Sequence, residues 1–144
     1  MKISVVTPTY NEFDNIGKIY DEIKNKFKEI NCEYEHIIID NNSSDGTIDK
    51  IKDLAKNDKN LKIIINSKNY GHIRSPFHGL LQSNGDATIL MAADFQDPID
   101  LISKYITEWK KGNKIILGEK ITSDENKIKF SLRKLFYNFL NYLS

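Results

Sequence analysis

The sequence predicts an α/β protein with a mainly parallel sheet flanked by helices. Short apolar runs alternate with longer amphipathic stretches along the chain, which is typical of repeated strand-helix-strand units. The run Ile37-Ile38-Ile39 is continuously apolar, as expected of a strand buried on both faces. Because parallel strands all point the same way, polar residues that follow them should gather at one edge of the sheet.

The first half of the chain supplies three strands and two helices. Ile3 to Thr7 is the first strand. Phe13 to Ile30 is predicted to be a helix because its apolar residues recur every three or four positions. Strands over Tyr34 to Asp40 and Leu61 to Asn66 then flank a helix over Thr47 to Lys56.

The second half is predicted to continue with a helix, a strand, a helix and a fifth strand, over Ile73 to Ser83, Ala87 to Met91, Asp97 to Trp109 and Lys114 to Leu117. Pro76 can enter the first of these helices only near its first turn. We expect Asp97 to cap the second helix and Pro98 to occupy its first position.

Residues 1–125 form one predicted domain, and Asn126 to Ser144 form a separate amphipathic helix. Apolar residues recur there at helical spacing, with aromatic and basic side chains between them. Two interpretations are open. The helix packs on its own sheet or on a further part of the protein, or it lies on a membrane surface.

Composition limits the classes of function. The chain has 144 residues and a formal net charge of +1, which gives no sign of a nucleic-acid partner. Its single cysteine, Cys32, excludes an intramolecular disulfide and suits a reducing compartment. The apolar run at the N-terminus is too short for a signal peptide, and no run approaches the roughly 18 apolar residues of a membrane span. We therefore expect a cytoplasmic protein.

Polar segments follow four of the predicted strands. They are Pro8 to Glu12, Asp40 to Thr47, Asn69 to Arg74 and Asp94 to Gln96. A tyrosine such as Tyr10 can stack on a base, and carboxylates can accept hydrogen bonds from a base edge or from ribose. Arginine can neutralise a phosphate.

The segment after the fourth strand is suited to a metal ion. Asp94 and Gln96 offer two oxygen ligands for a hard divalent cation, and such an ion commonly binds a diphosphate. An ordinary strand-to-helix turn also explains this segment, and both descriptions can hold together. Asp45-Gly46-Thr47 is explained by a turn and helix start alone.

Other motifs are absent. His36, His72 and His78 show no metal-ligand spacing. The sequence lacks a Gly-x-Gly-x-x-Gly fingerprint and a Walker lysine loop, which counts against a dinucleotide oxidoreductase or a P-loop nucleotidase.

Together these segments resemble the family 2 glycosyltransferases, which have the Rossmann-like GT-A fold. The resemblance is greatest to the branch that transfers sugars onto polyprenyl phosphates, such as dolichol-phosphate mannosyltransferases and bactoprenol glucosyltransferases. Val5 to Glu12 resembles the family's opening nucleotide loop, Asp40 to Thr47 its second loop, and Gly85 to Pro98 its metal strand. The match covers essentially the whole chain in the right order.

The resemblance implies that residues 1–125 are the nucleotide-sugar-binding domain, the N-terminal donor-binding portion of such an enzyme. The residues it implies in donor binding are Pro8, Thr9, Tyr10, Glu12, Asp40, Asn42, Arg74, Ala93, Asp94 and Lys120. It implies that Asp94 and Gln96 bind Mg²⁺ or Mn²⁺ on the diphosphate. It identifies no catalytic base.

The sequence departs from the family's pattern in four respects. Ala92 stands where the usual Asp-x-Asp motif has its first carboxylate, and Lys120 stands where an arginine is common, which keeps the charge but loses bidentate geometry. Arg74-Ser75-Pro76 replaces small helix-forming residues. Family members also usually continue past this length with the acceptor half of the site.

The expected activity is inverting transfer of a hexose from a UDP- or GDP-sugar to a polyprenyl phosphate or a surface glycan. Alternatives are a non-catalytic nucleotide-sugar-binding module and an inactive truncated transferase. A nucleotidyltransferase is disfavoured because no glycine-rich basic loop lies near Pro8. We expect no nucleic-acid partner, and expect peripheral membrane contact at the cytoplasmic face or self-association through residues 126–144.

Overall fold

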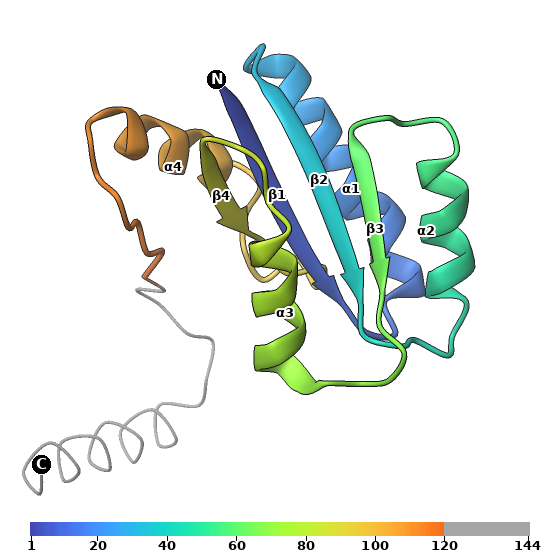
Figure 1. The fold of residues 1–144 in the computed structure, drawn as a ribbon. Helices are drawn as coiled ribbons and strands as arrows, with labels where there is room; N and C mark the ends of the chain where they lie inside the picture. The colour runs from blue at the N-terminus through green and yellow to red at the C-terminus, as the bar shows by residue number, and fades with distance from the viewer. Residues whose placement is uncertain (120–144) are drawn as a thin grey trace, which may run out of the picture.

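The computed structural model describes residues 1–119, and its centre is a four-stranded parallel sheet with the strand order β3-β2-β1-β4 (Figure 1). The predicted residues 126–144 and Lys120 lie outside this part. The elements in chain order are β1 (Lys2–Thr9), α1 (Phe13–Glu29), β2 (Glu33–Asp40), α2 (Thr47–Ala55), β3 (Leu61–Ile65), α3 (Gly71–Leu81), β4 (Ala87–Leu90) and α4 (Leu101–Lys110).

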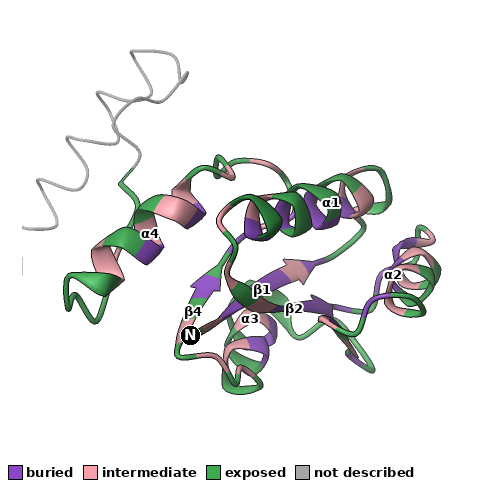
Figure 2. Ribbon diagram, turned by 90° about the horizontal axis from the view of Figure 1, so that it is seen from above, coloured by how far each residue is buried: buried purple, intermediate pink, exposed green. Residues whose placement is uncertain are grey.

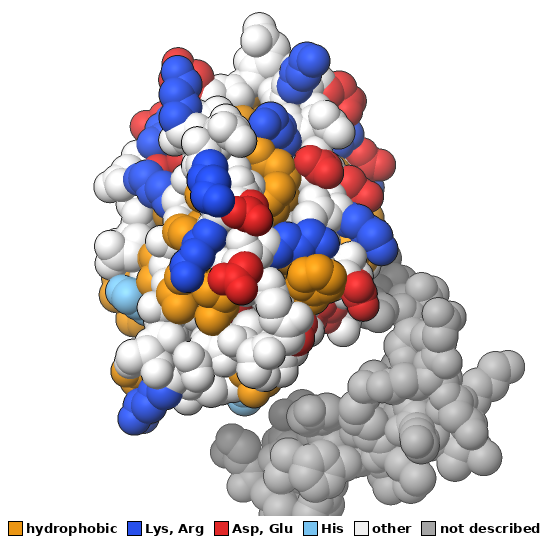
Figure 3. All heavy atoms as spheres, turned by 90° about the vertical axis from the view of Figure 1, so that its right-hand side faces the viewer, with side chains coloured by type: hydrophobic (Ala, Val, Ile, Leu, Met, Phe, Trp, Pro, Cys, Tyr) orange, Lys and Arg blue, Asp and Glu red, His pale blue; other side chains and the backbone are white. Residues whose placement is uncertain are grey.

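Helices cover both faces of the sheet, as predicted. α1, α2 and α4 contribute to one hydrophobic core, whereas α3 is the one helix among residues 1–119 that packs on the opposite face (Figure 2). Within β2, Ile38 belongs to the larger core, and Ile37 and Ile39 pack on the α3 side with Val6. The Ile-Ile-Ile run therefore fills both faces. Over α2 and β3 the outer surface carries acidic and basic side chains side by side (Figure 3).

β1 is longer than the sequence predicts. It continues through Pro8 and Thr9, which pair in register with Ile39 and Asp40 of β2. On the other side of β1, pairing with β4 ends at Val6. Pro8 therefore has no β4 residue opposite it, which is why the missing N–H of a proline is tolerated in a central strand.

α3 begins two residues before its predicted start. Its first residue, Gly71, has a φ of +84°, and its N–H donates to the side-chain oxygen of Asn69 at 2.8 Å. Pro76 is the sixth residue of α3, so its predicted place near the first turn is wrong. Because Pro76 has no N–H, the carbonyl of His72 lacks its helical donor.

α4 begins later than predicted, and Asp97 does not cap it. The helix starts at Leu101, after a turn in which the Leu101 N–H donates to the Pro98 carbonyl at 3.0 Å. The preceding residue, Asp100, accepts a hydrogen bond from Lys26 of α1 at 2.8 Å. This long-range ion pair fixes the start of the helix against α1, and a local sequence pattern cannot show it.

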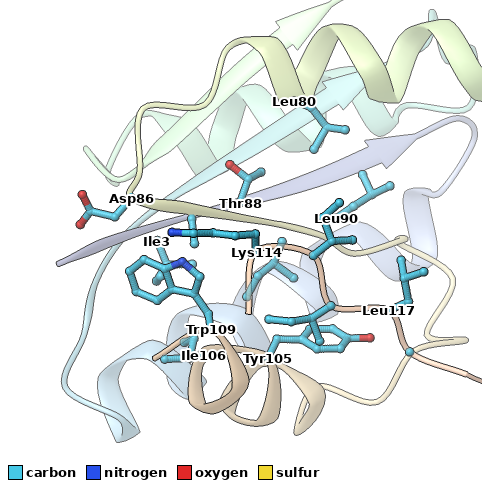
Figure 4. Close-up of a pocket in the computed structure, with 15 residues that line it drawn as sticks. Ile3, Leu80, Asp86, Thr88, Leu90, Tyr105, Ile106, Trp109, Lys114 and Leu117 are labelled. Carbon is cyan, nitrogen blue, oxygen red and sulfur yellow. The ribbon is translucent and has the colours of Figure 1, made fainter. Parts of the chain in front are cut away.

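The predicted fifth strand, Lys114 to Leu117, is wrong: the segment forms no ladder with β4 in the described part of the chain. Ile115 and Leu117 are 83% and 87% exposed. The segment lies across a hollow of about 660 Å³ from β4, with Leu90, Tyr105 and Trp109 among the lining side chains (Figure 4). No layer within residues 1–119 covers these apolar side chains, so strand pairing there would not bury them.

Two glycines offer a matched test of this packing. A Cβ on Gly79 of α3 would lie 2.8 Å from Val6 Cγ1 and 3.0 Å from Ile39 Cγ2, inside the core. Gly79→Ala is expected to destabilise the fold by about 1–2 kcal/mol, because overpacking outweighs the gain in helix propensity. In Gly17→Ala in α1, the new Cβ meets only the far end of the long Lys50 side chain, so this variant should be neutral or stabilising. Urea unfolding checks both, and equal effects would contradict this account.

Candidate functional site

A cleft of about 500 Å³, open to solvent, lies between the carboxyl ends of β1 and β2 and the start of α3. The residues that line it are Pro8, Thr9, Tyr10, Glu12, Asn41, Asn69, Gly71, His72, Ser75 and Pro76. Four residues predicted from the first loop therefore lie together, and they share the cleft with residues from two other loops.

The loops after β1 and β2 are held to each other by hydrogen bonds. The Asn11 N–H donates to Ser43 Oγ at 2.8 Å, and its side chain accepts from the Ser44 N–H at 2.9 Å. The Glu12 N–H donates to Thr47 Oγ1 at 3.0 Å. Tyr10, at the tip, is 48% exposed. Its ring is available for stacking while the backbone beside it is fixed.

Asp45-Gly46-Thr47 forms the turn that the sequence predicts. Asp45 accepts hydrogen bonds from the Thr47 hydroxyl at 2.6 Å and from the Phe13 N–H at 3.0 Å. These contacts, with that from Thr47 the largest, lower the pKa of the Asp45 carboxyl. The residue is fully explained by its structural role at the start of α2.

Asp40 is fully buried. Its two carboxylate oxygens accept hydrogen bonds from Ser43, one from the N–H at 2.8 Å and one from the hydroxyl at 2.5 Å. It does not line the cleft, and neither does Asn42, which is exposed with a φ of +68°. Asp40 thus holds the start of the loop after β2 in place through Ser43, and the neighbouring Asn41 lines the cleft.

Asn41 joins the end of β2 to the start of α3. Its Oδ1 accepts from the Tyr70 N–H at 2.9 Å and from Asn66 at 3.2 Å. Its Nδ2 donates to Asn69 Oδ1 at 2.8 Å and to the Gly71 carbonyl at 3.3 Å. All the hydrogen-bonding capacity of this amide is used in shaping the cleft wall.

Asn41→Asp tests that role. An oxygen in place of Nδ2 would face two acceptors, so we expect a loss of about 1–2 kcal/mol in the free energy of unfolding. The matched control is Asn42→Asp, one residue on, which adds the same charge at an exposed position without a side-chain hydrogen bond in the described part. Urea unfolding at neutral pH measures both. A loss of equal size in the two variants would contradict the assignment.

The predicted metal segment lies in the bend between β4 and α4. Ala93 is buried, Asp94 and Gln96 are exposed, and Phe95 between them has a φ of +58°. The Gln96 N–H donates to Asp94 Oδ1 at 3.2 Å. Within residues 1–119 no group of three His, Cys, Asp or Glu side chains could hold a metal ion. A single carboxylate with an amide oxygen fits a hard cation that takes its other ligands from water and phosphate.

Arg74 does not join this cleft. It lines a separate hollow of about 490 Å³ beside β3, together with Tyr70 and His78. The cleft instead contains His72, on the first turn of α3. Sequence reasoning missed His72 and Asn41. Their positions directly after a strand and at a helix start were the available signal.

A model of the family described as Glycosyl transferase family 2 matches residues 4–143. Over 146 residues the chain is 32% identical to a bactoprenol glucosyl transferase of Shigella phage SfX, covering 100% of this chain and 48% of that protein. It is 33% identical over 120 residues to a dolichol-phosphate mannosyltransferase of Pyrococcus furiosus, covering 83% of this chain and 33% of that protein. The chain thus spans less than half the length of these relatives.

Solved structures show a similar fold. The crystal structure of S. aureus TarS in complex with UDP-GlcNAc matches with a TM-score of 0.64 and 23% identity, over 88% of this chain and 38% of that one. The mannosyltransferase PcManGT from Pyrobaculum calidifontis, in complex with GDP-Man and Mn²⁺, matches with a TM-score of 0.59 and 21% identity, over 72% and 31%. The predicted GT-A fold is confirmed.

Proposed function

Because this chain belongs to glycosyl transferase family 2, we propose that it binds a nucleotide-sugar donor in the cleft beyond β1 and β2. The observation that carries the proposal is the cleft itself, which brings Pro8, Thr9, Tyr10 and Glu12 together at the carboxyl ends of parallel strands. Tyr10 would stack on the base, and Glu12 would accept a hydrogen bond from the nucleoside.

Asp94 and Gln96 would hold a divalent cation, which when bound neutralises the diphosphate of the donor. The cation is supported by Mn²⁺ in the similar mannosyltransferase structure and by the oxygen donors of the bend. The exposed positions of both side chains leave room for phosphate and water ligands. Ala92 supplies no ligand, so the protein's share of the coordination is small.

The proposed reaction is transfer of a hexose with inversion at the anomeric carbon. Donor candidates are UDP- and GDP-sugars, since similar structures hold UDP-GlcNAc and GDP-Man. A polyprenyl phosphate is the proposed acceptor, supported by the similarity to a bactoprenol glucosyl transferase. This acceptor would place the reaction at the cytoplasmic face of a membrane.

Calorimetry of the chain with UDP-glucose and GDP-mannose, with and without Mn²⁺, tests the donor site. We expect metal-dependent binding of one of them, and no binding of either would refute the proposal. Release of UDP or GDP in the presence of a polyprenyl phosphate then separates an enzyme from a non-catalytic binding module.

A further inference from the structure

The outer side of α3 carries large apolar side chains that no other described element covers. Ile73, Phe77 and Leu81 follow one another at intervals of four residues and therefore lie on one side of the helix. They are 71%, 59% and 65% exposed. The core formed by residues 1–119 buries little of these side chains, so that core does not explain why the three positions are apolar.

The stretch of chain that carries this apolar stripe is basic. The twenty residues from 66 to 85 include Lys68 and Arg74 but no aspartate or glutamate. Lys68 Nζ lies 5.3 Å from the centre of the Tyr70 ring, at the start of α3. The face over α2 and β3 is different, because acidic and basic side chains alternate there (Figure 3).

α3 is also accessible to a broad surface. It is the only described helix on its side of the sheet, so α1, α2 and α4 do not shield it (Figure 2). Its first turn forms one wall of the cleft, through Gly71 and His72. Whatever binds α3 therefore lies next to the proposed donor site.

We propose that α3 docks on an anionic membrane surface. Ile73, Phe77 and Leu81 enter the boundary between headgroups and acyl chains, and Lys68 and Arg74 contact lipid phosphates. An apolar stripe accompanied by Lys68 and Arg74, in a stretch of chain without aspartate or glutamate, complements such a surface. A purely apolar protein partner would gain nothing from the two positive charges. Docking of α3 would bring the donor cleft to a lipid-linked acceptor, and this benefit rests on the proposed function. The docking itself does not depend on it.

Co-sedimentation of the full chain with vesicles tests the docking without any donor. The vesicles are phosphatidylcholine alone, or phosphatidylcholine and phosphatidylglycerol in equal parts. Binding is expected to the anionic vesicles and to weaken as salt is added. Lys68→Glu with Arg74→Glu should lower the vesicle affinity about 25-fold or more, at about fivefold per basic residue. The control pair Lys52→Glu and Lys59→Glu, at exposed positions in and after α2, makes the same charge change away from α3.

The triple variant I73Q/F77Q/L81Q tests the apolar stripe. All three side chains are mostly exposed, so the variant should fold, and its circular dichroism and urea midpoint confirm that. Vesicle affinity should fall about tenfold or more, while donor affinity by calorimetry stays unchanged. Vesicle binding equal to that of the unmodified chain, in both the triple and the charge variant, would overturn the proposal and assign binding to another segment.

A further outcome also overturns the proposal. The chain could fail to bind anionic vesicles and instead form a dimer in solution, while the triple variant stays monomeric. In that case the stripe is an interface between copies of the chain. If the chain binds no nucleotide sugar, the result of the vesicle measurement is unaffected, because the two measurements use different ligands. The docking proposal and the proposed function can therefore fail separately.

Discussion

Asp94→Asn is expected to lower the rate of the proposed sugar transfer in the presence of Mn²⁺ or Mg²⁺ about a hundredfold, because a metal that stabilises a departing diphosphate contributes several kcal/mol. The amide removes the single carboxylate of the proposed site while keeping its size. Donor affinity measured without metal should not change. The difference between the titrations with and without metal is therefore the informative quantity.

The matched control is Asp97→Asn, three residues further on. Asp97 is exposed and does not cap α4, so the same chemical change there should leave metal-dependent binding intact. If both variants lose the metal effect equally, the loss reflects the general negative charge of the bend. Asp94 would then not be a ligand.

Glu35→Gln is expected to cost about 3 kcal/mol in the free energy of unfolding, at the low end for breaking a buried ion pair because its lysine partners are partly exposed. Glu35 is 2% exposed at the amino-terminal end of the sheet. One carboxylate oxygen accepts from Ser4 Oγ at 2.6 Å and from the Asn84 N–H at 2.7 Å. The other faces Lys62 at 2.6 Å and Lys2 at 3.0 Å.

Glu33→Gln is the control for this variant, since Glu33 lies two residues earlier on the same strand and is exposed. Urea unfolding at pH 7 should separate the two clearly. A loss in the Glu33 variant as large as that in the Glu35 variant would show that the carboxylate of Glu35 has no special role.

The same carboxylate gives stability a predictable dependence on pH. Burial raises the pKa of Glu35, but the hydrogen bonds, led by that from Lys62, outweigh it and lower the pKa from 4.5 to about 2. The unfolded chain therefore takes up a proton first, so the contribution is complete above about pH 4.5 and is lost as the pH falls toward 2. The decline of the urea midpoint over that range should be smaller in Glu35→Gln.

His36 also makes the free energy of unfolding fall as the pH falls, but it does so at a higher pH than Glu35. Burial lowers the pKa of this imidazole from 6.5 to about 3, and its Nε2 lies 2.9 Å from Thr7 Oγ1. Because the unfolded chain is protonated first, stability also declines as the pH falls below about 6.5. In Glu35→Gln, the urea midpoint should therefore still decline as the pH falls from about 6.5 to 4.5.

Much of the fold could be read from the sequence because hydrophobic periodicity is a local signal. The alternation of apolar runs and amphipathic stretches predicted four strands and four helices in the right order, and Ile37 to Ile39 indicated a strand covered on both faces. The predicted fifth strand was wrong because Lys114 to Leu117 has the composition of a strand but no layer in the described part to pack against.

The sequence by itself determined the order of the elements, the four polar segments that follow strands and the family to which they correspond. Only the tertiary structure decided which side chains face the cleft. Successive side chains of a strand point to opposite sides, so the point where β2 ends determined that Asp40 is buried and Asn41 lines the cleft. The rotation of α3 likewise placed His72 in the cleft and Arg74 outside it. These orientations depend on hydrogen bonds to residues distant in sequence, as does the burial of Glu35, whose partners lie 31 and 49 positions away. No local pattern contains such contacts.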